Sequence, residues 1–170
     1  MAEQKLLVRR EGDFHYPIYF EKDFSGLAQA VKEEGLSGHK ICVVTDSHVE
    51  PLYLKSVMDS LQEVSSQIFS FVFEAGEKNK NLDTVQELYR SLIEHEMDRK
   101  GFLVALGGGV VGDLTGFGAA TYLRGIDFIQ TGEFFKRLFF RIRGEVFSEN
   151  FVAQFVALFR IVAEFGMYRF

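Results

Sequence analysis

Hydrophobic and polar positions follow two different periods along the first 130 residues. The strand-like stretches are short, and most are rich in β-branched or aromatic residues. They lie at 5–9, 17–20, 40–45, 67–73, 102–106 and 127–130. Gly12 and Asp13 separate the first two, which predicts a β-hairpin. The continuous apolar runs at 40–45 and 102–106 are typical of strands that are covered on both faces.

Helical spacing fills the intervals between the later strands. One helix is predicted over 25–34, ending at Gly35, and a second runs to about residue 63. Ser47 and Glu50 give that second helix a capping-box pattern, and Pro51 suits its first turn. A third helix over 81–95 shows an apolar face, and a fourth ends near Tyr122. The apolar face of the third consists of Leu82, Val85, Leu88, Tyr89 and Leu92.

Strands and helices therefore alternate, which sets the fold class. Such an order implies right-handed βαβ crossovers. We expect a Rossmann-like α/β fold, with an N-terminal β-hairpin and a parallel sheet that carries helices on both faces.

The composition changes after residue 130. Residues 131–170 contain ten of the 19 phenylalanines, with six basic and four acidic residues, against 13 and 20 before them. On a helical period Asn150, Arg160 and Glu164 share one arc and leave the remainder apolar. We therefore expect two units: a domain over 1–130, and a helical Phe-rich tail over 131–170 that packs on the sheet or self-associates.

Overall composition narrows the classes of protein. An apolar fraction of 47% and a charged fraction of 25% are typical of a folded globular chain. A lone Cys42 cannot form an internal disulfide, which favours a reducing compartment. No apolar run resembles a signal peptide or reaches about 18 residues, so we expect a cytoplasmic protein. The net charge of −5 argues against nucleic acid as a partner.

Candidate binding residues follow three of the predicted strands, at 46–48, 75–80 and 107–109. In an open α/β sheet, ligands bind beyond the carboxyl ends of the strands. Residues 107–112 satisfy G-x-G-x-x-G, a pattern in which backbone N–H groups approach a pyrophosphate at a helix N-terminus. The motif follows a late strand, and Asp127 stands before a strand, so it departs from the usual dinucleotide fingerprint.

Each of these features also has a purely structural explanation. Asp46 suits a turn, Glu77 and Lys80 suit a solvated ion pair, and three glycines suit tight packing. No pair of histidines has the spacing of a metal site.

Three segments resemble the amino-terminal half of the 3-dehydroquinate synthase family, in its order and spacing. They are VVTDSHVEPLY at 43–53, EAGEKNKNLDTVQELY at 74–89 and LGGGVVGDLTGFGAATYLRGIDFIQ at 106–130. The resemblance implies the NAD-binding part of a lyase of the shikimate pathway, which converts a seven-carbon keto-sugar-acid phosphate to 3-dehydroquinate and phosphate. In that family NAD oxidises a hydroxyl transiently, and zinc or cobalt polarises the oxygens concerned.

The resemblance also assigns roles to individual positions. Asp113 and Arg124 would contact the phosphorylated substrate, Arg124 through its fork of donors. The expected cofactor-binding residues are Asp46, Ser47, His48, Glu77, Lys78, Asn79, Lys80, Gly108, Gly109, Val110, Val111, Gly112 and Asp113. No catalytic set is complete in this chain, and none of the family's metal ligands can be carried over.

After Gln130 the sequence leaves the family pattern, so we expect a truncated or frame-disrupted synthase that is inactive by itself. Two alternatives stay open. One is another sugar-phosphate cyclase, or a glycerol or iron-type dehydrogenase. The other is a non-catalytic nucleotide-binding or membrane-associated fragment.

Overall fold

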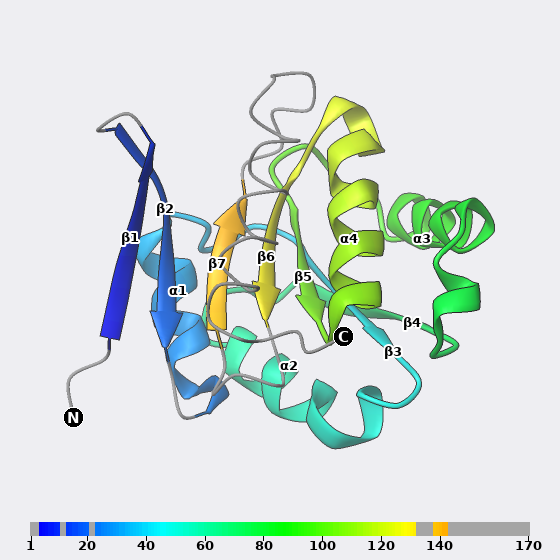
Figure 1. Cartoon of the computed structure of the whole chain (residues 1–170), viewed down its shortest axis with the longest axis horizontal. Coiled ribbons are helices and arrows are strands. Elements are labelled where there is room, and N and C mark those ends of the chain that lie inside the picture. Colours follow the sequence, from blue (N-terminus) through cyan, green and yellow to red (C-terminus); the bar gives the residue numbers. More distant parts are fainter. Residues whose placement is uncertain (1–3, 11–12, 21–22, 132–137, 143–170) are drawn as a thin grey trace.

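The computed structural model describes residues 4–10, 13–20, 23–131 and 138–142 (Figure 1). Their seven strands form one sheet, ordered β1-β2-β7-β6-β5-β3-β4. The strands are β1 (Gln4–Arg10), β2 (Asp13–Phe20), β3 (Ile41–Asp46), β4 (Ile68–Phe73), β5 (Phe102–Leu106), β6 (Asp127–Thr131) and β7 (Leu138–Ile142). The helices are α1 (Leu27–Glu33), α2 (Lys55–Leu61), α3 (Leu82–Glu94) and α4 (Gly109–Thr121). The predicted α/β fold and the hairpin of β1 and β2 are confirmed.

The strands β6, β5, β3 and β4 are parallel and carry a helical layer on each face (Figure 1). Along β3, Cys42 and Val44 pack with α3 and α4, whereas Ile41 and Val43 pack with α1 and α2. Because successive side chains of a strand point to opposite faces, a continuous apolar run supplies both cores. All four of these side chains are fully buried.

The helix after β3 begins differently from the prediction. Ser47 does not cap it, since the Ser47 hydroxyl accepts a hydrogen bond from the backbone N–H of Ala75. The Asp46 carboxylate accepts the N–H groups of His48 and Val49 instead, and a π-helical turn over Glu50–Leu54 precedes α2. The capping-box prediction was wrong because the Ser47 hydroxyl is hydrogen-bonded to the loop after β4 and not to the first turn of its own helix.

One residue of the predicted apolar face of α3 is also misplaced. Leu82 is 65% exposed, whereas Val85, Leu88 and Leu92 are buried. The helix begins there, because the side chain of Asn81 accepts the N–H of Thr84 as an N-cap. The buried stripe therefore starts at the second turn, and Leu82 borders an open pocket.

Strand β7 links the two halves of the sheet. It pairs antiparallel with β6 on one side and with β2 on the other. Of the tail over 131–170, for which we expected helix, the structure describes Thr131, at the end of β6, and the five residues of β7, and all six are in strands. The apolar helical face expected over 150–165 lies outside the described residues. The boundary after residue 130 stays a prediction. Within the described part of the chain, no helix has the length and apolar character needed to cross a membrane.

Candidate functional site at the carboxyl edge of the sheet

The loops after β3 and β4 are joined to each other at the carboxyl edge. The Ser47 N–H donates to the Phe73 carbonyl at 2.9 Å, and the Ala75 N–H donates to the Ser47 hydroxyl at 3.1 Å. Asp46 and Phe73 are partners in the parallel register, so the two strands end level. The predicted segments 46–48 and 75–80 therefore lie side by side.

The Asp46 carboxylate is engaged by its own turn. One of its oxygens accepts the N–H groups of His48 at 2.9 Å and Val49 at 3.0 Å. The carboxylate is thereby fixed at the end of the strand next to β5, and the His48 side chain is exposed beside it. The turn explanation and the binding prediction are compatible, because a carboxylate has about four acceptor positions.

The loop after β4 has a defined shape. Gly76 has φ of 120°, a conformation that side chains other than glycine rarely adopt. The Asn79 side chain donates to the Glu74 carbonyl at 2.7 Å, and the Lys78 carbonyl accepts the Asn81 side chain at 2.9 Å. Asn79 and Lys78 thus hold the loop through local bonds, and Lys80 at its end reaches α4.

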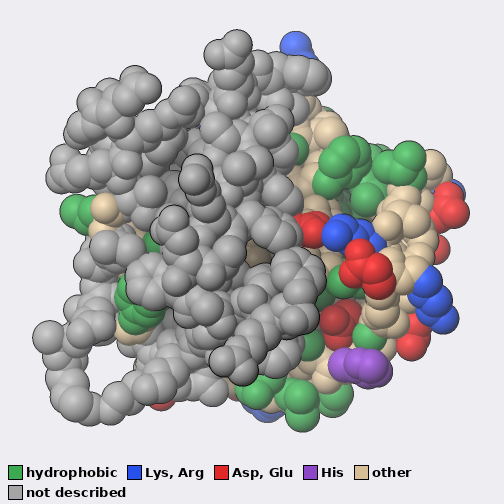
Figure 2. Space-filling view, viewed as in Figure 1, with side chains coloured by type: hydrophobic (Ala, Val, Ile, Leu, Met, Phe, Trp, Pro, Cys, Tyr) green, Lys and Arg blue, Asp and Glu red, His purple; other side chains and the backbone are tan. Residues whose placement is uncertain are grey.

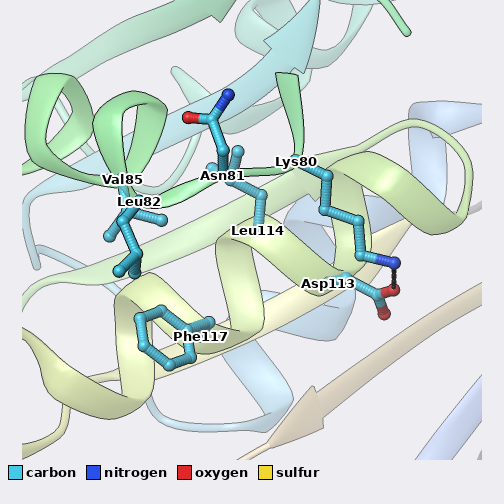
Figure 3. A pocket seen from close by; sticks show the side chains of 7 residues that line it. All are labelled: Lys80, Asn81, Leu82, Val85, Asp113, Leu114 and Phe117. Atoms are coloured by element: carbon cyan, nitrogen blue, oxygen red, sulfur yellow. Dashed lines mark ion pairs between the residues drawn. The ribbon is translucent and has the colours of Figure 1, made fainter. Parts of the chain in front are cut away.

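Lys80 connects this loop to α4 (Figure 3). Its Nζ lies 2.6 Å from an Asp113 carboxylate oxygen and 3.3 Å from a Glu77 oxygen. The hydrogen bond to Asp113 is the main cause that raises the pKa of Lys80 above its usual value. The three residues form an acid–base–acid cluster. Residues 33 positions apart in the sequence are thus held together beside the glycine loop.

The glycine loop ends β5 and opens α4. Gly108 is the N-cap in an extended conformation, with no side-chain cap. The first N–H groups of a helix have no partner within the helix, and the macrodipole makes this end favourable for an anion. Val111 contributes to this end only through its backbone, since its side chain is fully buried. The predicted anion site at Gly108–Val110 is therefore stereochemically available.

Gly107 has a structural role in this loop. A Cβ atom at Gly107 would lie 2.6 Å from Cγ2 of Val111, and its φ of 157° disfavours other residues. Its N–H donates to the Thr131 carbonyl at 3.3 Å, which ties the end of β5 to the end of β6. Close packing and backbone exposure therefore coexist in the triple glycine.

A pocket of about 400 Å³ opens between α3 and α4 beside Lys80 (Figure 3). Lys80 and Asp113 form its polar end, and Leu82, Val85 and Phe117 form an apolar end. This volume is within the range of small-molecule sites. Figure 2 shows charged groups near the centre of the side that carries these helices.

Arg124 lies apart from the other predicted residues. It follows α4, whose 13 residues span about 20 Å from the glycine loop. Strand β6 starts at Asp127, which pairs with Phe102 at the beginning of β5. Arg124 is therefore at the amino edge of the sheet, with φ of 68°, and does not join the cluster in this chain.

The sequence interpretation overlooked Gln130 near the end of β6. Its side-chain amide lies against Gly112 in the first turn of α4. The available signal was the alternation along the strand, because Phe128 and Gln130 share a face. Among the residues that the structure describes, no cluster of three His, Cys, Asp or Glu side chains could hold a metal ion. Burial raises the pKa of the Cys42 thiol, so this cysteine behaves as a small apolar residue.

Comparison with known sequences identifies relatives of this region. Residues 70–133 match the family model described as 3-dehydroquinate synthase N-terminal. The 3-dehydroquinate synthase of Acetivibrio thermocellus is 42% identical over 118 residues, which cover 69% of this chain and 32% of the relative. That of Streptococcus pneumoniae (strain ATCC 700669 / Spain 23F-1) is 45% identical, with coverage of 68% and 33%. The chain thus spans about a third of the length of these relatives.

Two solved structures have the same architecture. A 2-deoxy-scyllo-inosose synthase complexed with carbaglucose-6-phosphate, NAD⁺ and Co²⁺ superposes with a TM-score of 0.64. The superposed residues cover 77% of this chain and 35% of the inosose synthase chain. At 19% identity, the match establishes the fold alone. A 2-epi-5-epi-valiolone synthase from Streptomyces hygroscopicus subsp. jinggangensis, with NAD⁺ and Zn²⁺ bound, has a TM-score of 0.52 and 26% identity. The superposed residues cover 61% of this chain and 29% of the valiolone synthase chain.

Proposed function

Because this chain carries the N-terminal domain of the 3-dehydroquinate synthase family, we propose that it binds NAD at the carboxyl edge of its parallel strands. The observation that carries the proposal is the Lys80 link, which joins the loop after β4 to α4 beside the exposed helix N-terminus. The valiolone synthase at 26% identity was solved with NAD⁺ bound, which supports the same cofactor here.

The described residues would hold the cofactor by complementary chemistry. Gly109 and Val110 are the first residues of α4, at the positive end of its dipole, where backbone N–H groups suit the pyrophosphate. Asp46 ends the strand beside β5, where a carboxylate can accept a ribose hydroxyl. Lys80 keeps its positive charge within reach of the same edge, and Asp113 and Glu77 hold it in place. When bound, NAD supplies a hydride acceptor.

The activity of the longer relatives is part of the same proposal. Their shared name implies formation of 3-dehydroquinate. The resemblance of the sequence to that family adds a phosphorylated sugar acid as the substrate and phosphate as the second product. The metal expected from the resemblance does not fit the described residues, so we assign no step to it. Arg124 can serve a phosphorylated substrate only outside the Lys80 cluster.

The proposal includes a cytoplasmic location, supported by the lone Cys42.

Titration calorimetry of the purified 170-residue chain tests this function. We expect measurable but weak NAD binding, and we expect Lys80→Ala to weaken it about tenfold or more, because the variant removes a positive charge from the site. Lys100→Ala is the matched control, since Lys100 lies in the loop before β5 at the opposite edge. Absence of NAD binding by the folded wild-type chain would refute the proposal.

A separate assay tests the catalytic expectation. With NAD and zinc or cobalt present, phosphate release from the keto-sugar-acid phosphate should stay at background for these 170 residues. The chain covers about a third of its relatives, and its described residues supply no metal site. Robust release by the purified chain would contradict this expectation while leaving the binding site intact.

A further inference from the structure

Gln130 occupies the space that a side chain at position 112 would need. A Cβ atom on Gly112 would lie 2.5 Å from Nε2 of Gln130 and 3.0 Å from its Cδ. Gly112 is buried in the first turn of α4, one turn after Gly108. The Gln130 amide is therefore packed directly against the turn that presents the open N–H groups.

The hydrogen-bonding groups of this amide have no protein partner within the described part of the chain. Across the described ranges, no side chain or backbone group forms a hydrogen bond with the Gln130 amide, and the residue is partly exposed. A primary amide offers two N–H donors and a carbonyl acceptor. Solvent or a ligand at this edge can therefore take all of them. The packing against Gly112 fixes their position in advance.

The location of Gln130 relative to β5 decides which part of a ligand it meets. Asp46 and the loop over 75–80 lie on the side of β3 and β4, whereas Gln130 lies on the opposite side, on β6. A pyrophosphate at the N-terminus of α4 sits between them. In such sheets, the adenosine ribose binds a carboxylate at the end of the strand that neighbours the glycine-loop strand, which is Asp46 of β3 in this chain. The second nucleoside then extends to the other side of β5, over β6.

We propose that Gln130 contacts the nicotinamide riboside half of NAD through its side-chain amide. The inference rests on the proposed NAD site and goes further, because it assigns the orientation of the dinucleotide and a residue for its second half. The riboside is rich in hydroxyl groups and carries a carboxamide. A neutral amide with both donors and an acceptor complements these groups without repelling the pyrophosphate.

Titration of two ligands into two proteins tests the inference. Gln130→Met keeps the length of the side chain and its contact with Gly112 but removes the hydrogen bonds. We expect its affinity for NAD to fall about fivefold, as for loss of a hydrogen bond, and its affinity for ADP to stay within twofold of the wild type. ADP carries the adenosine and pyrophosphate but lacks the second nucleoside, so it isolates the contact.

The other outcomes are distinguishable. An unchanged NAD affinity in Gln130→Met overturns the inference while the NAD site stands. An equal loss for ADP and NAD also overturns it, because the effect would then lie at the pyrophosphate or in the shape of the loop. If the wild-type chain binds ADP and NAD with equal affinity, the second nucleoside makes no contact and the inference fails. Binding of neither ligand refutes the proposed function itself. Gln130→Leu, a second neutral variant without hydrogen-bonding groups in its side chain, serves if the Met variant does not fold.

Discussion

The two halves of the sheet are stabilised in different ways. In the parallel half, β3 and β5 are enclosed by neighbouring strands and by helices on both faces, and their apolar side chains are fully or almost fully buried. In the antiparallel half, β1 and β2 form a local hairpin that reaches the rest of the sheet through β7. All the loops of the candidate NAD site belong to the parallel half.

This difference separates the part of the sheet that carries the candidate NAD site from the part that joins the N-terminal hairpin to it. The parallel half places the ends of distant segments at one edge, which is what a dinucleotide site requires. The antiparallel half contributes no predicted site residue. Its backbone pairing with the parallel half runs through five residues, Leu138–Ile142, from a part of the chain where the family resemblance has ended. Ile18 and Tyr19 of β2 add packing against the two helical layers. Binding and attachment can therefore be separated by mutation.

The largest effect is expected from a proline in the connecting strand. Phe140 pairs with Ile18 of β2 and with Gln130 of β6, so Phe140→Pro removes a backbone donor from a central strand. We expect the free energy of unfolding to fall by about 3 kcal/mol. Hydrogen exchange should show lost protection in β1 and β2, with protection in β3 and β5 retained.

Phe140→Val is the matched control for this variant. Valine keeps the N–H group and favours extended backbone, so hydrogen-exchange protection of β1 and β2 should survive. If the proline variant leaves both strands protected, β7 is not what attaches the hairpin. If protection of β3 and β5 is lost as well, the two halves unfold as one cooperative unit, and the comparison fails.

The second prediction separates packing from binding within the glycine loop. Gly109 is the first residue of α4 and is exposed, so Gly109→Val should fold normally. Its branched side chain stands where the pyrophosphate approaches, and we expect a tenfold or greater loss of NAD affinity, about 1.4 kcal/mol. Calorimetry with unchanged affinity would mean that the loop serves packing alone.

Gly107→Ala should give the opposite pattern. Its Cβ would meet Val111 at 2.6 Å, and overpacking of this kind costs about 1–3 kcal/mol of stability. We expect a lower melting temperature in Gly107→Ala, and a melting temperature near that of the wild type in Gly109→Val. Equal melting temperatures in the two variants would contradict the assignment of these roles.

The parallel half could be predicted from sequence because local signals there agree with tertiary structure. The apolar run at 102–106 matches β5 residue for residue, and Gly35, with φ of 70°, ends the first helix as expected. The same signals predicted that the loops after β3, β4 and β5 share the carboxyl edge of the sheet. It failed at Ser47, where a backbone donor from a loop 28 residues away competes with the local cap.

The rest depended on contacts that no local pattern records. Strand β7 is defined by its pairing with β2 and β6, and a helical period in the later part of the tail obscured its extended backbone. Gln130 matters because Gly112 lacks a side chain 18 residues earlier. Arg124 was expected, by resemblance, to contact the phosphorylated substrate together with Asp113, although a whole helix separates Arg124 from the glycine loop.

A smaller effect is expected from acid. The N–H groups of Gly101 and Lys100 hold the pKa of Asp98 below its ordinary value of 3.8. A lowered pKa in the folded state stabilises the fold at higher pH, and the contribution is lost as pH falls through that folded value. Asp98→Asn should therefore melt slightly lower than the wild type at pH 6, and the difference should shrink below about pH 3.5. A difference that persists in acid would exclude the charge as its cause.

The smallest effect, none on NAD binding, is expected at Arg124. Its guanidinium belongs to the amino edge, and α4 holds that edge about 20 Å from the open N–H groups of the glycine loop. At this separation, about 2.5 Debye lengths at physiological salt, the charge of an exposed arginine is screened. Arg124→Ala should therefore bind NAD within twofold of the wild type by calorimetry at 0.15 M salt, whereas Lys80→Ala weakens binding. Equal losses of NAD affinity in the two variants would show that the amino edge, which carries Arg124, also takes part in the cofactor site. The carboxyl edge would then no longer be the sole location of the site.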